Sequence, residues 1–123
     1  MRTGEIALER GDDGFAVLAV SGEHDLSTVP DLRRQLDELI ASGRATVIDL
    51  SPATFVDSSV LGAILDARRR AGEAGVAFAV AQAENGAEAV TRVLDITGLR
   101  EELPVHPDRD AAVSAVTGSE NGT

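Results

Sequence analysis

Apolar residues follow two kinds of pattern along the chain. Some form continuous, largely apolar runs, which are FAVLAV at 15–20, TVIDL at 46–50 and VAFAV at 76–80. Runs of this length are typical of strands that are covered on both faces of a sheet. Others recur every three or four residues, as in a helix that buries one face: Val29, Leu32, Leu36, Leu39 and Ile40 in one segment, and Leu61, Ile64 and Leu65 in another. The pattern therefore predicts buried strands that alternate with amphipathic helices.

The first half of the chain carries turn and capping residues at the expected ends of its elements. Residues 5–10 predict an initial strand, and the GDDG that follows predicts a turn into the strand at 15–20. Ser27 or Thr28 is a candidate N-cap for the first helix, and Gly43 supplies its C-terminal stop. We therefore expect a hairpin before the first helix.

The second half continues in the same way. Asn85 and Glu88 have the spacing of a capping box for a third helix, which should stop before Gly98. Residues 103–107 (LPVHP) predict a short edge strand, because proline cannot donate a ladder hydrogen bond. Residues 108–116 predict a last helix.

The predicted elements define the fold class. Their order is strand, strand, helix, strand, helix, strand, helix, strand, helix. This order predicts one α/β domain with a mostly parallel mixed β-sheet, an N-terminal antiparallel strand and about four α-helices. We expect this domain to span residues 1–116 and residues 117–123 (TGSENGT) to form a disordered tail.

Charge and composition limit the classes of partner. The formal net charge is −10, with 21 acidic against 11 basic residues. Binding to nucleic acid depends on Lys and Arg against phosphates, and an anionic membrane surface would repel an acidic protein, so we expect neither partner. Cysteine is absent, which excludes disulfides and thiolate chemistry. The N-terminus has no signal-peptide core, and no apolar segment approaches bilayer-spanning length, so we expect a cytoplasmic protein.

A small polar cluster interrupts the apolar pattern after a short predicted loop that follows Leu50. Asp57, Ser58 and Ser59 lie where this loop enters the second helix. In the simpler interpretation, Asp57 or Ser58 is an N-cap that satisfies free amides at the helix start. In the other, one hydroxyl accepts a phosphate, which the amides and the positive end of the helix dipole would tolerate and to which Asp57 would add negative charge.

Glu23 and Asp25 form a second polar cluster, after the first buried strand. They are either solvated loop carboxylates or neighbours of Ser58, if their strand lies beside the one that ends at Leu50. Together with Asp57 they could also hold Mg²⁺, although no spacing specifies such a site, and we expect no metal and no cofactor.

Catalysis is not expected from this sequence. Ser58 lies in VDSSV, which lacks both glycines of the G-x-S-x-G nucleophile elbow. The two histidines, His24 and His106, have no spacing that identifies a base for Ser58, and we expect them to be ordinary loop and edge-strand residues. No phosphate-binding G-x-x-x-x-G-K-[ST] loop is present.

Three segments resemble a known family. They are LAVSGEHDLSTVPDLRRQL, VIDLSPATFVDSSVLGAIL and VLDITGLREELPVHPD, which together with the order of elements cover roughly residues 5–116. They resemble a STAS domain and, more narrowly, the bacterial anti-sigma factor antagonists. The DSS block is specific for this family when it occurs with the GE-x-D segment.

The resemblance implies a switch protein and not an enzyme. An unphosphorylated antagonist of this family binds an anti-sigma factor and so releases a sigma factor. The anti-sigma factor is itself a serine kinase of the histidine-kinase-like ATPase fold, which uses ATP and Mg²⁺ to phosphorylate the antagonist and end the complex. A serine phosphatase then resets the switch.

Carried over by motif, the resemblance makes Ser58 the phosphorylation site, with its neighbour Ser59 as the second candidate. It also implies a partner-binding surface around this serine. The expected partner-binding residues are Glu23, Asp25, Asp57, Ser58, Ser59, Val60, Leu61 and Ile64.

The chain departs from the family pattern at two positions. Val60 replaces a usual glycine, which could place a branched side chain beside the acceptor and narrow the access of a kinase. His24 replaces a usual leucine and is expected to be an exposed bystander, or a source of weak pH sensitivity. The alternative function is a constitutively binding STAS scaffold or a small subunit of a larger assembly, for example one associated with a transporter, without phosphorylation.

Overall fold

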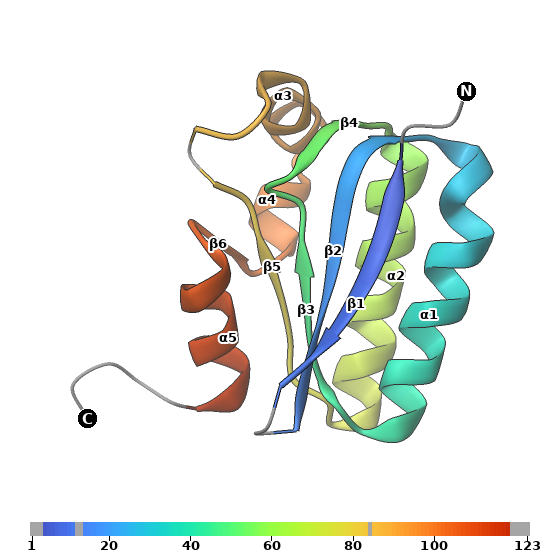
Figure 1. Ribbon diagram of the computed structural model, residues 1–123, viewed down its shortest axis with the longest axis vertical. Coiled ribbons are helices and arrows are strands. Elements are labelled where there is room, and N and C mark those ends of the chain that lie inside the picture. Colours follow the sequence, from blue (N-terminus) through green and yellow to red (C-terminus); the bar gives the residue numbers. More distant parts are fainter. Residues whose placement is uncertain (1–3, 12–13, 84, 119–123) are drawn as a thin grey trace.

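A mixed β-sheet forms the centre of the protein (Figure 1). The computed structural model describes residues 4–11, 14–83 and 85–118. Five strands are paired in the order β1-β2-β3-β5-β6, and β4 pairs with the far end of β2. β1 runs antiparallel to β2, and the other pairs are parallel, which confirms the predicted α/β fold and its initial hairpin. The strands are β1 (Glu5–Arg10), β2 (Phe15–His24), β3 (Ala45–Asp49), β4 (Ala53–Val56), β5 (Phe78–Ala81) and β6 (Val105–His106).

Helices cover the two faces of the sheet unequally (Figure 1). The long helices α1 and α2 pack side by side on one face, and α5 packs on the other, against β3 and β5. α3 follows β5 and packs against β4 and the short α4. The helical elements are η1 (Leu26–Thr28, a 3-10 turn), α1 (Val29–Ser42), α2 (Ser58–Ala74), α3 (Glu88–Thr97), α4 (Leu99–Glu102) and α5 (Arg109–Thr117).

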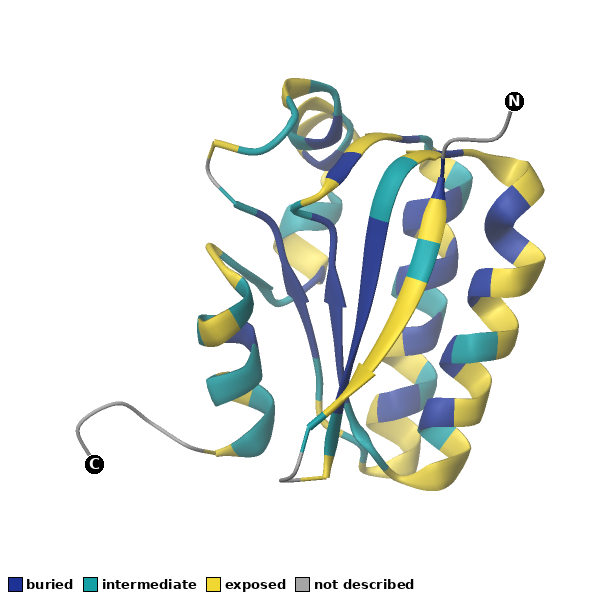
Figure 2. Cartoon of the chain, in the orientation of Figure 1, coloured by how far each residue is buried: buried dark blue, intermediate teal, exposed yellow. Residues whose placement is uncertain are grey.

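The central strands are buried on both sides, as their continuous apolar runs predict (Figure 2). Leu18 and Ile48 join the large core beneath α1 and α2. Val17 and Val47 point the other way, into a smaller core beneath α5. β1 has no such cover, and Figure 2 shows most of this strand exposed.

The segment predicted as a short loop after Leu50 contains a strand. β4 runs parallel to the end of β2, with Glu23 opposite Phe55 and His24 opposite Val56. The pairing shifts register between Gly22 and Glu23, and Gly22 adopts φ 80°, a left-handed conformation that glycine accepts without steric cost. This bulge lets β2 pair with β3 along its first half and with β4 at its end.

Helix ends agree with the sequence at most positions. Gly43 and Gly98 cap α1 and α3 in left-handed conformations, as predicted. The predicted capping box is wrong, because α3 begins at Glu88 with Ala87 as its N-cap and no side-chain hydrogen bond. α5 includes Thr117, one residue beyond the predicted domain end, and residues 119–123 of the predicted tail lie outside the described residues, as do the middle residues of the GDDG turn.

A partly buried ion-pair network attaches α5 to the sheet. Arg109 Nε lies 3.0 Å from Asp49 Oδ2 on β3, and its Nη1 lies 2.9 Å from Glu9 Oε1 on β1. Burial lowers the pKa of Arg109, but the hydrogen bonds and charges of Asp49 and Glu9 outweigh this effect, so the pKa is raised overall and the guanidinium stays charged. No helix in the described ranges combines the length and apolar character needed to cross a membrane.

Candidate functional site

Asp57 starts α2 and fixes the conformation of the two serines that follow it. It is the N-cap residue, and its Oδ1 accepts hydrogen bonds from the backbone N–H groups of Ser59 (3.1 Å) and Val60 (3.2 Å). An aspartate is favoured here because its side chain satisfies amides that have no partner within the helix. This confirms the capping role predicted for Asp57 and places Ser58 at the first helical position.

The two serine hydroxyls differ in their bonding. Ser59 is half-buried, and its Oγ donates a hydrogen bond to Asp57 Oδ1 at 2.5 Å. Ser58 is exposed, and its hydroxyl has no hydrogen-bond partner among the described residues. A reacting hydroxyl must reach its partner free of competing bonds, so the geometry favours Ser58 over Ser59 as an acceptor.

The pairing of β2 with β4 brings the acidic segment to this serine. The backbone N–H of Asp57 donates to the carbonyl of His24 at 3.2 Å. Glu23 and Asp25 flank His24 in the chain, and both are exposed. The structure thus places the two sequence clusters side by side at the carboxyl end of the sheet, where parallel α/β sheets usually present functional residues.

Asp25 organises the turn at the end of β2. Its Oδ1 accepts hydrogen bonds from the hydroxyl (2.5 Å) and the backbone N–H (2.9 Å) of Ser27, the middle residue of the 3-10 turn η1, for which Asp25 is the N-cap. These bonds, the hydroxyl first, lower the pKa of Asp25 below its ordinary value because they favour the charged carboxylate. Asp25 therefore carries a fixed negative charge next to α2 at neutral pH.

His24 is buried, which corrects the expectation of an exposed bystander. Only 1% of its surface is accessible. Its Nε2 lies 2.9 Å from the carbonyl oxygen of Ser21, and its Nδ1 lies 3.2 Å from Thr28 Oγ1. Gly4 closes over the ring, since a Cβ there would lie 2.1 Å from the Glu23 carbonyl and 2.9 Å from His24 Nε2. The buried imidazole therefore links the end of β2, through Ser21, to the 3-10 turn η1, through Thr28.

Three residues expected to contact a partner lie in the core instead. The side chains of Val60, Leu61 and Ile64 have 0% exposure and belong to the large core between α2 and the sheet. Leu61 and Ile64 also fit the predicted core face of this helix, and that interpretation is the correct one. Val60 points away from solvent, so its branched side chain does not crowd the Ser58 hydroxyl.

Two exposed apolar residues beside Ser58 were missed by the sequence analysis. Leu26 follows Asp25 and is 67% exposed, and Phe55 lies opposite Glu23 on β4 and is 40% exposed. An aromatic residue is conspicuous in a chain with 2% aromatics, but its exposure depends on the register of β4. We call the surface made by Glu23, Asp25, Leu26, Phe55, Asp57 and Ser58 the Ser58 face.

The Ser58 face does not have the arrangement of a metal or hydrolase site. Over residues 4–11, 14–83 and 85–118, no three His, Cys, Asp or Glu side chains are placed to hold a metal ion, so Glu23, Asp25 and Asp57 do not form the triad considered above. His24 is bonded to Ser21 and Thr28. His106 lies on β6, which β3 and β5 separate from β2.

Comparisons with known proteins agree with the overall fold. A model of the STAS domain family matches residues 8–112. An anti-sigma factor antagonist from Mycobacterium paratuberculosis has 31% identity and a TM-score of 0.80, over 93% of this chain and 94% of that one. SpoIIAA in its unphosphorylated form has 21% identity and a TM-score of 0.77, over 95% and 100% of the two chains. Phosphorylated SpoIIAA from Bacillus has 20% identity and a TM-score of 0.66, over 89% and 97%. No curated protein sequence gives a significant match.

Proposed function

The chain belongs to the STAS domain family, and from this premise and the geometry at the start of α2 we propose that it is an anti-sigma factor antagonist controlled by phosphorylation of Ser58. The proposed partner is an anti-sigma factor that is also a serine kinase of the histidine-kinase-like ATPase fold. A serine phosphatase would restore the binding-competent form. The similarity to an anti-sigma factor antagonist at 31% identity over nearly the whole chain supports this role.

The free hydroxyl of Ser58 is the observation that carries the proposal. It stands exposed at the first position of a 17-residue helix, whereas the hydroxyl of Ser59 is bonded to Asp57. A phosphate on Ser58 would lie at the positive end of the helix dipole, near backbone amides that favour anions. Phosphorylation should therefore leave the fold intact.

The same phosphate would change the surface that a partner meets. It adds between about −1.5 and −2 charges at neutral pH, next to the carboxylates of Asp25 and Asp57. Leu26 and Phe55 give the unmodified face exposed apolar area, which is the part of an interface that contributes most to affinity. A charged group beside this area would have to lose water on binding, so the modified form should bind weakly.

We propose the Ser58 face as the docking surface, with Leu26 and Phe55 added to the residues expected from sequence. Ser59 contributes by its bond to Asp57. Val60, Leu61 and Ile64 support this surface from the core and do not contact the partner.

The alternative of a constitutive scaffold has lost its main support. That alternative depended on Val60 as an obstacle beside the acceptor, and Val60 lies inside the core.

The direct test is phosphorylation with ATP, Mg²⁺ and the candidate anti-sigma kinase, read by peptide mass spectrometry. Trypsin should release residues 45–68 as one peptide, and fragmentation separates Ser58 from Ser59, Ser51 and Thr54. We expect Ser58→Ala to abolish the phosphate and Ser59→Ala, as the matched control, to keep it. A Ser58→Ala protein that is still modified at the wild-type rate would exclude this acceptor.

A binding assay separates charge from size. We expect Ser58→Asp to weaken binding to the kinase at least about tenfold, and Ser58→Asn, of similar size but neutral, to weaken it much less. Both variants should keep the wild-type melting temperature to within a few degrees. Equal binding by Ser58→Asp and wild type would contradict the proposed switch.

A further inference from the structure

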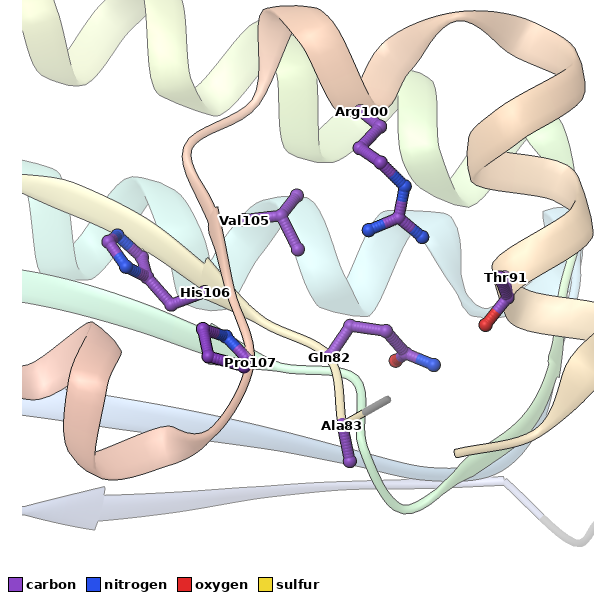
Figure 3. A pocket seen from close by; sticks show the side chains of 7 residues that line it. All are labelled: Gln82, Ala83, Thr91, Arg100, Val105, His106 and Pro107. Carbon is purple, nitrogen blue, oxygen red and sulfur yellow. The ribbon is translucent and has the colours of Figure 1, made fainter. Parts of the chain in front are cut away.

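A hollow lies away from the Ser58 face, at the ends of β5 and β6 beneath α3 and α4 (Figure 3). Its volume is about 380 Å³, which lies at the lower end of the range for small-molecule sites. We call it the Gln82 cavity. It is lined by Gln82, Ala83, Thr91, Arg100, Val105, His106 and Pro107.

Gln82 is the unusual residue of this cavity. It is 4% exposed, and its backbone N–H donates to the carbonyl of His106 at 2.9 Å. Its side-chain Oε1 and Nε2 are buried without any hydrogen-bond partner in the described part of the chain. A buried amide without partners is costly, and such a group in a native structure calls for an explanation. A leucine would fill similar space without this cost.

Arg100 places a positive charge over the same cavity. Its Nε donates to Asp95 Oδ1 at 2.9 Å, and this ion pair fixes the guanidinium. Within the described residues, its two terminal nitrogens make no hydrogen bond. Figure 3 shows the Gln82 amide, the Arg100 guanidinium and the Thr91 side chain directed toward the same space, with the His106 ring on the opposite side. None of the seven lining residues is acidic.

These groups define the chemistry of a ligand. Two adjacent guanidinium N–H groups match the two oxygens of a carboxylate. The Gln82 amide can both donate and accept, so it suits a hydroxyl, an amide or a second carboxyl group. Val105, Ala83 and Pro107 supply apolar walls for a short carbon chain. Gln82 lines the cavity, and because the last torsion of its side chain has a broad preference, a rotation about that bond would turn either amide atom toward a ligand.

We propose that the Gln82 cavity binds a small carboxylate that carries a second hydrogen-bonding group, with Arg100 on the carboxylate and Gln82 on the second group. Thr91 offers a hydroxyl to either end. No residue of the Ser58 face lines this cavity, so the result of a binding test here does not depend on the phosphorylation of Ser58.

The test is a titration of the ¹⁵N-labelled full chain with malate, succinate and glutarate, followed by amide shifts at constant ionic strength. We expect at least one probe to shift the amides of Gln82, Ala83, Thr91 and Arg100 saturably below about 10 mM, which corresponds to millimolar or tighter affinity. Arg100→Gln should weaken the affinity for that probe at least about tenfold. Arg92→Gln, which removes the same charge from an exposed arginine of α3 outside the cavity, should leave affinity unchanged.

Gln82→Leu distinguishes a binding role from a structural one. Because it removes a buried amide without partners, it should raise the melting temperature of the free protein and, at the same time, abolish probe binding. The proposal is overturned if none of the three probes binds, or if Gln82→Leu and Arg100→Gln bind as well as wild type does.

Discussion

Ser58 and Ser59 are neighbours in the chain but differ in chemical environment. Asp57 uses one carboxylate oxygen to accept from two backbone amides and from the Ser59 hydroxyl. The cap that starts the helix therefore also withdraws one of the two hydroxyls from reaction. The other is left exposed by its position at the first helical residue. The proposed choice of Ser58 over Ser59 as acceptor thus follows from helix capping.

Val60 gives a prediction at the same scale. Restoring the family glycine by Val60→Gly should destabilise the protein by about 2–4 kcal/mol, because it removes a fully buried side chain from the core and adds backbone freedom to α2. It should not increase phosphorylation of Ser58, since Val60 does not cover that hydroxyl. Urea unfolding measures the first effect, and the kinase assay measures the second.

Gly62 provides the control in the same helix. It is exposed, and a Cβ there would meet nothing within 4 Å, so Gly62→Ala should be neutral or stabilise the protein by about 0.5–1 kcal/mol. If Val60→Gly kept wild-type stability and accelerated phosphorylation, Val60 would be a surface obstacle, contrary to the structure.

The long strand β2 is the element that assembles the candidate site. It pairs with β3 through its first five residues and with β4 through its last three, and the register shift lies within the β4 pairing, between Gly22 and Glu23. The second pairing sets the acidic segment at the end of β2 beside the segment that leads into α2. The backbone bond from Asp57 to His24 is the last link of this ladder.

Gly22→Ala tests this element. A residue with a Cβ at φ 80° should cost about 1–2 kcal/mol in unfolding free energy. It should also speed hydrogen exchange at the Asp57 amide more than at amides between β2 and β3, because the strain falls on the β4 pairing. Gly22→Asn should reduce the free energy of unfolding by less than Gly22→Ala does, since asparagine tolerates a left-handed backbone better than alanine. Equal losses in the two variants would show that the conformation of Gly22 is not the cause.

The elements that the sequence predicts well are those specified by local patterns. The central strands are predicted by their continuous apolar runs. Gly43 is the C-cap of α1, as the sequence indicates. β4 was missed because four residues without clean alternation carry little local information, and its partner lies some thirty residues away. The burial of His24 was missed for a similar reason, since Gly4 and Thr28 enclose it from other segments.

The candidate site was predictable in part. The sequence predicts a helix start at the DSS block with Asp57 or Ser58 as its N-cap, and Asp57 is the N-cap that the structure shows. The role of Ser58 as phosphate acceptor stays a prediction. The orientation of Val60, Leu61 and Ile64 required the helix phase relative to the sheet. These three apolar side chains are fully buried in the core, so they are not available to contact a partner.

The molecule as a whole has an asymmetric build. The large core lies beneath α1 and α2, while the opposite face depends on the single helix α5 and its small core. That helix is fastened by Arg109, whose partner Asp49 is 5% exposed on β3. One ion pair therefore links the C-terminal helix to the centre of the sheet.

Arg109→Gln should weaken this attachment. It leaves the Asp49 carboxylate without its cation, which should cost about 2 kcal/mol, less than a fully buried pair because the Arg109 side chain is 36% exposed. Amide exchange should increase first in α5. Arg34→Gln, which breaks only exposed pairs with Asp31 and Glu38, should cost less than about 1 kcal/mol. Similar effects of both variants on α5 would mean that Asp49 does not anchor it.

The separation between the Ser58 face and the residues beneath it affects how such proteins can diverge. Leu26, Phe55 and Glu23 lie outside the core, so exchanging them should alter what the proposed docking surface recognises at little cost to folding. Val60 and Ile64 pack in the core beneath this face and keep its backbone in place when the exposed residues change. Duplicated copies in one cell could thus acquire separate partners, and remain insulated from each other's signals, while they share one scaffold.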